Sequence, residues 1–147
     1  MIPPRGYGTD GYKWYVIGDI VVTRQMPGYS IADSLWDDFL STLKNNELRH
    51  CFSLTIGSAP VKPTQRKSAA EVLSENDIPA TVLTDNRLTR GILTAVSWLG
   101  ANVRSFSWDE LDTAMEVADV PTQYREDVRK IAAEYRFDCE RQASRSK

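Results

Sequence analysis

The hydrophobic and polar pattern is most regular between Pro79 and Trp108. A β-branched run over 80–83 precedes the polar cluster 84–86, and apolar residues then recur at helical spacing. These apolar positions are Leu88, Ile92, Ala95, Val96 and Leu99. Gly100 and Asn102 end this expected helix, and residues 103–106 again have the pattern of a strand. The order strand, helix, strand predicts a βαβ unit with parallel strands and a sheet covered by helices.

The N-terminal third has the pattern of two strands and a helix. Two β-rich runs, Trp14–Ile17 and Asp19–Arg24, flank a Gly-Asp step, which predicts a tight hairpin or one bent strand. Residues 1–11 are rich in Pro and Gly, and we expect them to form a flexible lead-in. Ser30 is expected to cap the next helix, with Trp36 packing beside its buried face. That face repeats every four residues, at Ile31, Leu35, Phe39 and Leu43.

The remainder of the chain alternates further strands and helices. A strand is expected over 48–56, and Pro63 suits the first turn of the helix after it. Ser107 and Glu110 have the spacing of a capping box at the start of another helix. A last helix is expected over 121–140, followed by a frayed polar tail over 141–147.

Together these elements predict a single-domain α/β sandwich over residues 12–140. Its sheet is expected to be mixed but mostly parallel, with four or five strands flanked by helices and an extra C-terminal helix. The chain of 147 residues has no internal repeat and no interior linker, so one domain is the expectation.

Composition and charge narrow the function classes. With 18 basic and 20 acidic side chains the net charge is −2, which gives no electrostatic footprint for nucleic acid or for a membrane surface. No apolar run reaches the ~20 residues of a membrane span, and the N-terminus lacks the apolar core of a secretion signal. We therefore expect a cytoplasmic protein in which Cys51 and Cys139 are free thiols rather than a disulfide.

The residue types that usually perform catalysis or bind metal are sparse. His50 is the only histidine, and its neighbour Cys51 would point to the opposite face of a strand. There is no Gly-x-Ser-x-Gly nucleophile motif, and one His with two distant Cys does not make a zinc set. We expect no enzyme activity, no metal and no cofactor, with His50 as a structural residue.

Two loops could hold an anion or a partner. Residues 57–62 follow a strand and precede a helix, and Lys62, Arg66 and Lys67 add positive charge there. A second set, Thr84, Asp85, Arg87 and Arg90, lies after the next strand. In a parallel sheet both loops lie at the same edge, where ligands usually bind, although neither matches a phosphate-binding motif. The alternative interpretation is helix capping beside a solvated basic turn.

The element order and two motifs resemble the STAS superfamily, the anti-anti-sigma-factor-like and STAS/SEC14-type domains of bacteria. The first motif is Pro63-Thr64-Gln65-Arg66-Lys67, and the second runs from Thr84-Asp85 through Arg90-Gly91 and Thr94-Ala95 to Ser97-Trp98-Leu99-Gly100. The resemblance implies a non-catalytic regulatory module that binds proteins. In phospho-switched members a serine in an Asp-Ser-Ser-Gly-like motif opens the corresponding helix. That motif is absent here, and Ser58 or Thr64 could replace it only by position.

Three hypotheses of function follow. The first is a regulatory or scaffold protein that binds a protein partner and is regulated by phosphorylation. The second is a domain that binds a small ligand, a nucleotide or a phosphate at the same sheet edge. The third is self-association, as a homodimer, because Trp is enriched at interfaces as well as in cores. The tryptophans are Trp14, Trp36, Trp98 and Trp108.

Overall fold

The computed structural model describes residues 4–97 and 99–145, with the side chain of Val96 also left out. Trp98 and the side chain of Val96, both parts of predictions made above, therefore lie outside the described residues. The same holds for residues 1–3 of the expected lead-in and residues 146–147 of the expected tail.

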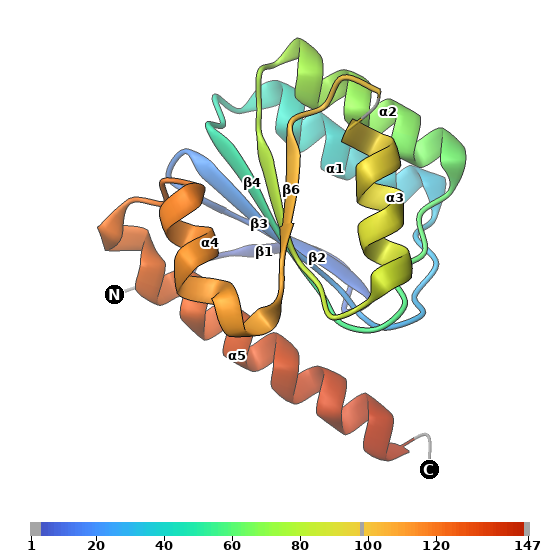
Figure 1. The fold of residues 1–147 in the computed structure, drawn as a ribbon, viewed down its shortest axis with the longest axis vertical. Coiled ribbons are helices and arrows are strands. Elements are labelled where there is room, and N and C mark those ends of the chain that lie inside the picture. The colour runs from blue at the N-terminus through green and yellow to red at the C-terminus, as the bar shows by residue number, and fades with distance from the viewer. Residues whose placement is uncertain (1–3, 98, 146–147) are drawn as a thin grey trace.

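One mixed sheet forms the centre of the molecule (Figure 1). Its strands lie in the order in which they occur in the chain: β1 (Gly6–Gly8), β2 (Tyr12–Ile17), β3 (Ile20–Gln25), β4 (His50–Thr55), β5 (Ala80–Leu83) and β6 (Val103–Phe106). The pairs β1–β2 and β2–β3 are antiparallel, whereas the pairs β3–β4, β4–β5 and β5–β6 are parallel. The predicted α/β class with a mostly parallel sheet is confirmed.

The sheet has six strands among the described residues, where the sequence predicts four or five. The additional strand is β1, which lies inside the expected flexible lead-in and pairs with β2 from Gly6↔Tyr15 to Gly8↔Lys13. The flexible lead-in is therefore wrong for residues 6–8. A short Gly-rich segment has no hydrophobic alternation, so its pairing depends on the edge that β2 offers.

The predicted hairpin, rather than one bent strand, joins β2 to β3. Ile17 and Ile20 are cross-strand partners, which leaves a two-residue loop of Gly18 and Asp19. Gly18 has φ +58°, a left-handed conformation that two-residue hairpin loops require and glycine adopts without strain.

Helices cover both faces of the sheet (Figure 1). One face carries α1 (Asp33–Asn45), α2 (Pro63–Glu75) and α3 (Arg87–Ser97), over a core that contains an aromatic group. The other face carries α4 (Leu111–Val117), preceded by the 3₁₀ turn η1 (Trp108–Glu110), and the long helix α5 (Thr122–Arg145). The aromatic group on the first face consists of Tyr12, Trp14, Trp36 and Phe39, whose ring centroids are 5.5–6.0 Å apart.

The structure corrects three further details of the sequence analysis. Helix α1 begins at Asp33 after Ala32, so Ser30 is not its N-cap. The apolar stripe expected for α3 is not wholly buried: Leu88 is 72% exposed, and Leu99, which lies beyond the end of the helix at Ser97, is 54% exposed. Helix α5 continues to Arg145 instead of fraying after residue 140. Its C-terminal part is held by tertiary contacts that helical periodicity does not reveal.

The capping box before α4 and the free thiols agree with the sequence analysis. The Ser107 amide donates to Glu110 Oε1 at 3.0 Å. Cys51 is buried in the core on the α1–α3 face, whereas Cys139 is buried in the core on the α5 face, so the sheet separates the two free thiols. In the part of the chain that the structure describes, no helix is long and apolar enough to cross a membrane.

Candidate functional site

The loops that follow β4 and β5 meet at one edge of the sheet, as the sequence predicts for parallel strands. The Gly57 amide donates to Asp85 Oδ1 at 2.8 Å, which ties the two loops together. The turn after β3 joins them, because the Gly28 amide donates to the Ser58 carbonyl at 2.7 Å. We call this edge the strand-end rim and define it by residues 26–31, 56–62 and 84–89.

Gln65, on the first turn of α2, organises the rim from within. Its side-chain amide donates to the Ile31 carbonyl at 2.8 Å and to Asp33 Oδ1 at 3.0 Å, while its Oε1 accepts the Lys62 amide at 3.1 Å. Its backbone carbonyl accepts the indole N–H of Trp36 at 3.0 Å. The sequence motif over 63–67 contains Gln65 but indicates no role for it. The available signal was a glutamine two residues after the N1 proline, the position from which it can reach back to the cap.

The start of α3 is fixed by two side chains of the polar cluster. The hydroxyl of Thr84, which is buried, accepts the Asn86 amide at 3.1 Å. Asn86 Oδ1 then accepts the Thr89 amide at 3.1 Å, the geometry of an N-cap. The helix-capping interpretation of this cluster is therefore correct for Thr84 and Asn86.

A cavity of about 310 Å³ opens between the rim and α3. Three of the residues that the sequence singles out line it: Ser58, Lys62 and Arg66. The remaining lining is largely apolar or uncharged and comes from Ser30, Ile31, Ala59, Pro60, Val61, Gln65, Asn86, Leu88, Thr89 and Ile92. We call this space the rim cavity. Its side chains offer hydroxyls, amides and two basic groups beside an apolar wall, an arrangement suited to binding.

The other residues expected at the site lie around the rim cavity rather than in it. Thr64 and Lys67 are exposed on α2, and Arg87 and Arg90 are exposed on the first turn of α3. Asp85 is exposed, and its carboxylate accepts the Gly57 amide. The structure thus brings the two predicted loops together but gives their residues different roles.

The contacts at the rim limit how an anion could bind there. The Gly57 amide belongs to the loop that the sequence predicts as a possible anion site, and it already donates to the carboxylate of Asp85. Lys62 Nζ lies 3.3 Å from Asp33 Oδ1, and Arg66 Nε donates to the Val61 carbonyl at 2.9 Å. An anion at these loops would therefore compete with two carboxylates of the protein itself.

His50 and Cys51 lie at the opposite edge, because they begin β4 whereas the rim follows its end. The His50 Nε2 is 2.8 Å from the hydroxyl of Thr81 in the interior. Burial, with a smaller contribution from Arg49, lowers the pKa of His50 to about 4, and burial raises the pKa of Cys51 to about 11. Both groups are therefore uncharged at neutral pH.

Metal-ligating residues do not gather at the rim or elsewhere in the described ranges. Over residues 4–97 and 99–145 no group of three or more His, Cys, Asp or Glu side chains is arranged to hold a metal ion.

Comparisons with known proteins give no family for this chain. No family model matches it, and neither a curated protein nor a solved structure does so. The interpretation of the rim therefore depends on its geometry and chemistry.

Proposed function

We propose that this protein is a non-catalytic regulatory or scaffold protein that binds a protein partner at the strand-end rim, as the STAS resemblance implies. The observation that carries this proposal is Leu88, which lines the rim cavity and leaves 72% of its surface in solvent. A large apolar side chain so exposed beside a cavity is typical of an interaction surface.

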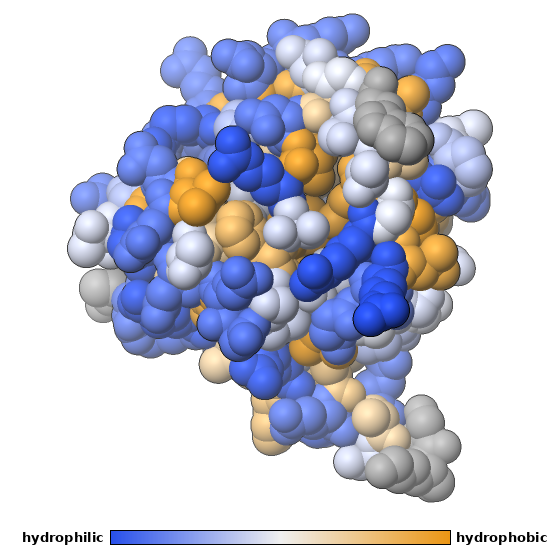
Figure 2. Space-filling model, viewed as in Figure 1, coloured by the Kyte–Doolittle hydropathy of each residue, from blue (hydrophilic) through white to orange (hydrophobic). Residues whose placement is uncertain are grey.

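The surroundings of Leu88 support this proposal. Ile92, one turn further along α3, and Val61 and Pro60 from the facing loop continue the apolar surface into the rim cavity. Figure 2 shows apolar atoms at the surface over α3, on a face that is otherwise largely hydrophilic. A partner side chain inserted between α3 and the loop would bury this surface, which is how the anchor residues of protein interfaces act.

The charge around the rim cavity favours an acidic partner. Two basic residues line it, Lys62 and Arg66, and three more are exposed on the helices that border it: Lys67, Arg87 and Arg90. The acidic residues nearby are fewer, and Asp33 and Asp85 are already engaged with Lys62 and the Gly57 amide. Charges of one sign at the edge of an interface speed association and select partners of the opposite sign.

Phosphorylation would act on the same surface. Ser58 is exposed and lines the rim cavity, and Thr64 is exposed on the first turn of α2. A phosphate would add about −1.5 to −2 charges beside Lys62 and Arg66, so it would reduce the attraction for an acidic partner. The phospho-mimic Ser58→Asp is therefore expected to weaken partner binding, whereas Ser58→Ala is expected to retain it.

Affinity capture with matched variants tests the proposal. The wild-type protein and Leu99→Glu should retain the same partner, and Leu88→Glu should lose it. Leu99 is the matched control because it follows the same helix, is 54% exposed and does not line the rim cavity. Equal retention by all three proteins would contradict the proposal, as would demonstrable turnover of a small substrate with no partner recovered.

The alternative proposal is that the rim cavity binds a small ligand, a nucleotide or a phosphate. Its volume and the basic groups of Lys62 and Arg66 are the observations in its favour. A thermal-shift screen of nucleotides and phosphates against the wild type and Arg66→Gln distinguishes it. An increase in melting temperature that Arg66→Gln abolishes would support a small ligand. No increase at millimolar ligand concentration would contradict this alternative.

Self-association gains no support from two of the four tryptophans. Trp14 and Trp36 are buried in the aromatic group, and their indole N–H groups donate to Thr42 Oγ1 and the Gln65 carbonyl. Trp108 is partly buried and donates to the Thr55 carbonyl, and Trp98 lies outside the described residues. The homodimer remains a proposal that size-exclusion chromatography with light scattering would test.

A further inference from the structure

A second and larger cavity lies on the α5 face of the sheet. It is open, has a volume of about 710 Å³, and shares no lining residue with the rim cavity. Its walls are the beginning of β2, the end of β3 with the turn 26–29, and the C-terminal part of α5. We call it the α5 cavity. Its polar side chains are Asp10, Lys13, Arg24, Tyr29, Asp138, Arg141, Gln142 and Arg145.

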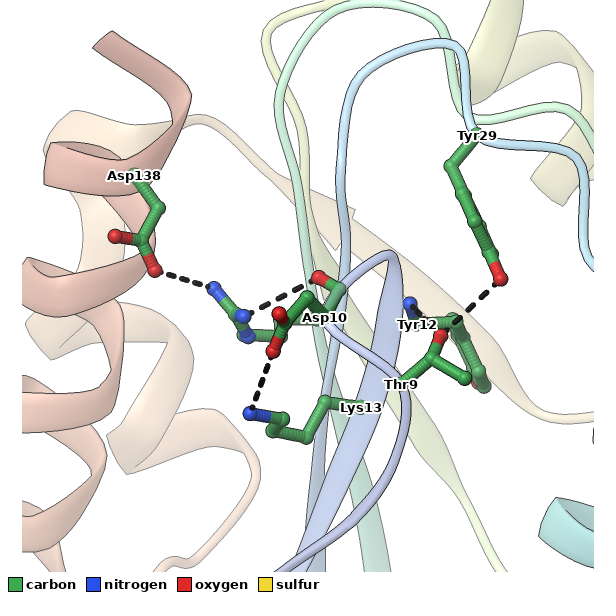
Figure 3. A network of polar contacts seen from close by, with 7 residues as sticks. Thr9, Asp10, Tyr12, Lys13, Tyr29 and Asp138 are labelled. Atoms are coloured by element: carbon green, nitrogen blue, oxygen red, sulfur yellow. Dashed lines mark hydrogen bonds and ion pairs between the residues drawn. The ribbon is translucent and has the colours of Figure 1, made fainter. Parts of the chain in front are cut away.

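Arg24 is the unusual residue of the α5 cavity, because its side chain is only 7% exposed. Its Nη1 donates to Asp138 Oδ2 at 2.9 Å and its Nη2 donates to the Asp10 carbonyl at 3.2 Å. Figure 3 shows that Asp138, on α5, and Asp10, in the loop before β2, approach this guanidinium from two sides. Its Nε is buried and has no hydrogen-bond partner among the described residues. A buried donor without an acceptor is costly, so such a group is a candidate for ligand binding.

The two strands place a second cation directly opposite Arg24. Lys13 and Arg24 are cross-strand partners in the β2–β3 ladder and face α5. Like charges at opposed positions destabilise a sheet. Asp10 offsets Lys13 at 3.4 Å and Asp138 offsets Arg24, so these four charges are balanced pairwise.

Two further cations remain in the α5 cavity. Arg141 and Arg145 line it from the last turns of α5, and neither forms a salt bridge within the described part of the chain. Four basic and two acidic side chains therefore line the cavity, which leaves a net charge of +2. This charge matches a dianion.

The walls of the α5 cavity are held in place without a ligand. Gln142 Nε2 donates to the Pro27 carbonyl at 3.0 Å, and the Tyr135 hydroxyl donates to the Gln25 carbonyl, so α5 is fixed to the end of β3. Met26, Pro27 and the ring of Tyr29 add apolar surface beside the charged wall. A preformed cavity with an apolar part and convergent polar groups is the usual form of a small-molecule site.

We propose that the α5 cavity binds a small organic phosphate monoester, with its dianionic phosphate between Arg24, Arg141 and Arg145. Guanidinium groups suit this role because their planar donors bind phosphate oxygens in pairs. The apolar wall at Met26, Pro27 and Tyr29 would contact the organic part. This site is separate from the strand-end rim, and its ligand would bind whether or not the rim binds a protein.

Calorimetry and NMR spectroscopy of the full chain test the proposal, with inorganic phosphate and phenyl phosphate as probes at constant ionic strength. We expect saturable binding, tighter for phenyl phosphate, and a shift of the assigned Arg24 Nε–H resonance that follows the same saturation curve. The double variant Arg141→Gln/Arg145→Gln should weaken binding of both probes at least tenfold. Both residues are exposed on α5, so this variant should fold.

The matched control is Lys44→Gln/Lys130→Gln, which removes the same charge from two exposed positions outside the α5 cavity. It should bind both probes as the wild type does. Equal weakening in both double variants would overturn the proposal in favour of general charge attraction. Binding that leaves the Arg24 resonance unmoved, or no binding at 20 mM probe, would also overturn the proposal. Arg24 would then only join β3 to α5 through its ion pair with Asp138.

Discussion

The rim cavity and the α5 cavity lie on either side of the segment 26–31, yet they use charge in opposite ways. At the rim the basic side chains are exposed or partly exposed, and the apolar Leu88 is exposed with them. In the α5 cavity the guanidinium of Arg24 is buried and held by Asp138, while Arg141 and Arg145 are exposed, and apolar groups form only part of the wall. Exposed charges are screened by water and steer large partners, whereas a desolvated charge discriminates strongly between small ligands.

The difference follows from how each region is built. The rim consists of loops whose polar groups bond mainly to one another, through Gln65, Asp85 and Asn86. The α5 cavity lies between a strand and a helix far apart in the sequence, since Arg24 and Asp138 are separated by 114 positions. A substitution in one of the two regions should therefore leave the geometry of the other region unchanged.

Phe52→Ala should affect both regions, because Phe52 is fully buried on the central strand β4 and belongs to the core on the α5 face. Removing its ring leaves a hole in the core, and we expect a loss of about 3–5 kcal/mol in the free energy of unfolding. The matched change Phe137→Ala, at a residue 57% exposed, should cost less than about 0.5 kcal/mol. Urea unfolding followed by circular dichroism measures both, and similar losses would contradict the burial described here.

Acidification should destabilise the sheet through His50, at the edge away from the rim. The folded protein holds the pKa of His50 at about 4, below the 6.5 of an unfolded chain, because burial disfavours the imidazolium. The unfolded state therefore binds the proton first. The contribution of neutral His50 to the free energy of unfolding amounts to about 3 kcal/mol. It is complete above pH 6.5 and is lost as the pH falls from 6.5 to 4.

Unfolding curves across this pH range check the prediction against His50→Gln. The variant should be less stable at pH 7 but should lose less stability between pH 6.5 and 4, because its side chain does not titrate. Parallel curves for the two proteins would show that His50 does not carry the effect.

Gln65→Ala should distinguish the two regions. The substitution leaves the Ile31 carbonyl and the Lys62 amide without their side-chain partner, so we expect a loss of about 1–3 kcal/mol. The rim should loosen while the α5 cavity keeps its geometry. The rate of amide hydrogen exchange should therefore increase for residues 57–66 and stay unchanged for residues 135–142. Gln123→Ala, at an exposed glutamine of α5, is the control and should change neither.

Leu88→Ser should change stability least, by less than about 0.5 kcal/mol, because Leu88 is mostly exposed. The same substitution at the buried Leu43 of α1 should cost several times more. Thermal unfolding of the two variants makes the comparison. A large loss in Leu88→Ser would show that Leu88 supports the fold, which would remove the main observation for a binding surface at the rim.

The βαβ unit that the sequence predicts over 79–108 is present in the structure with little change. Strands β5 and β6 occupy the expected residues, Asn86 caps the start of α3, and α3 ends at Ser97, before the expected stop at Gly100. These signals are local: β-branched runs, a side chain that accepts its own helix's amide, and a glycine with φ +97°. Local chemistry decides such features before tertiary contacts form, so sequence reasoning recovers them.

The strand β1 and the end of α5 were not predictable in the same way. Gly6–Gly8 carries no hydrophobic pattern, and its pairing exists because β2 has a free edge. Residues 141–145 are polar, and α5 continues there while Gln142 bonds to the Pro27 carbonyl. The partner of residues 141–145 is remote in sequence, whereas the partner of β1 is the neighbouring strand β2, and neither contact leaves a hydrophobic period in the segment itself.

The sequence by itself determined the α/β class, the parallel strands and the common edge at which Ser58, Lys62 and Asp85 meet, because each depends on local spacing and on the short connections between elements. Only the tertiary structure decided which of these residues face a cavity, that Leu88 is exposed rather than buried, and that Lys13 and Arg24 oppose each other beneath α5. The physical reason is that burial and charge balance are properties of neighbours in space, and those neighbours are set by packing after the local elements have formed.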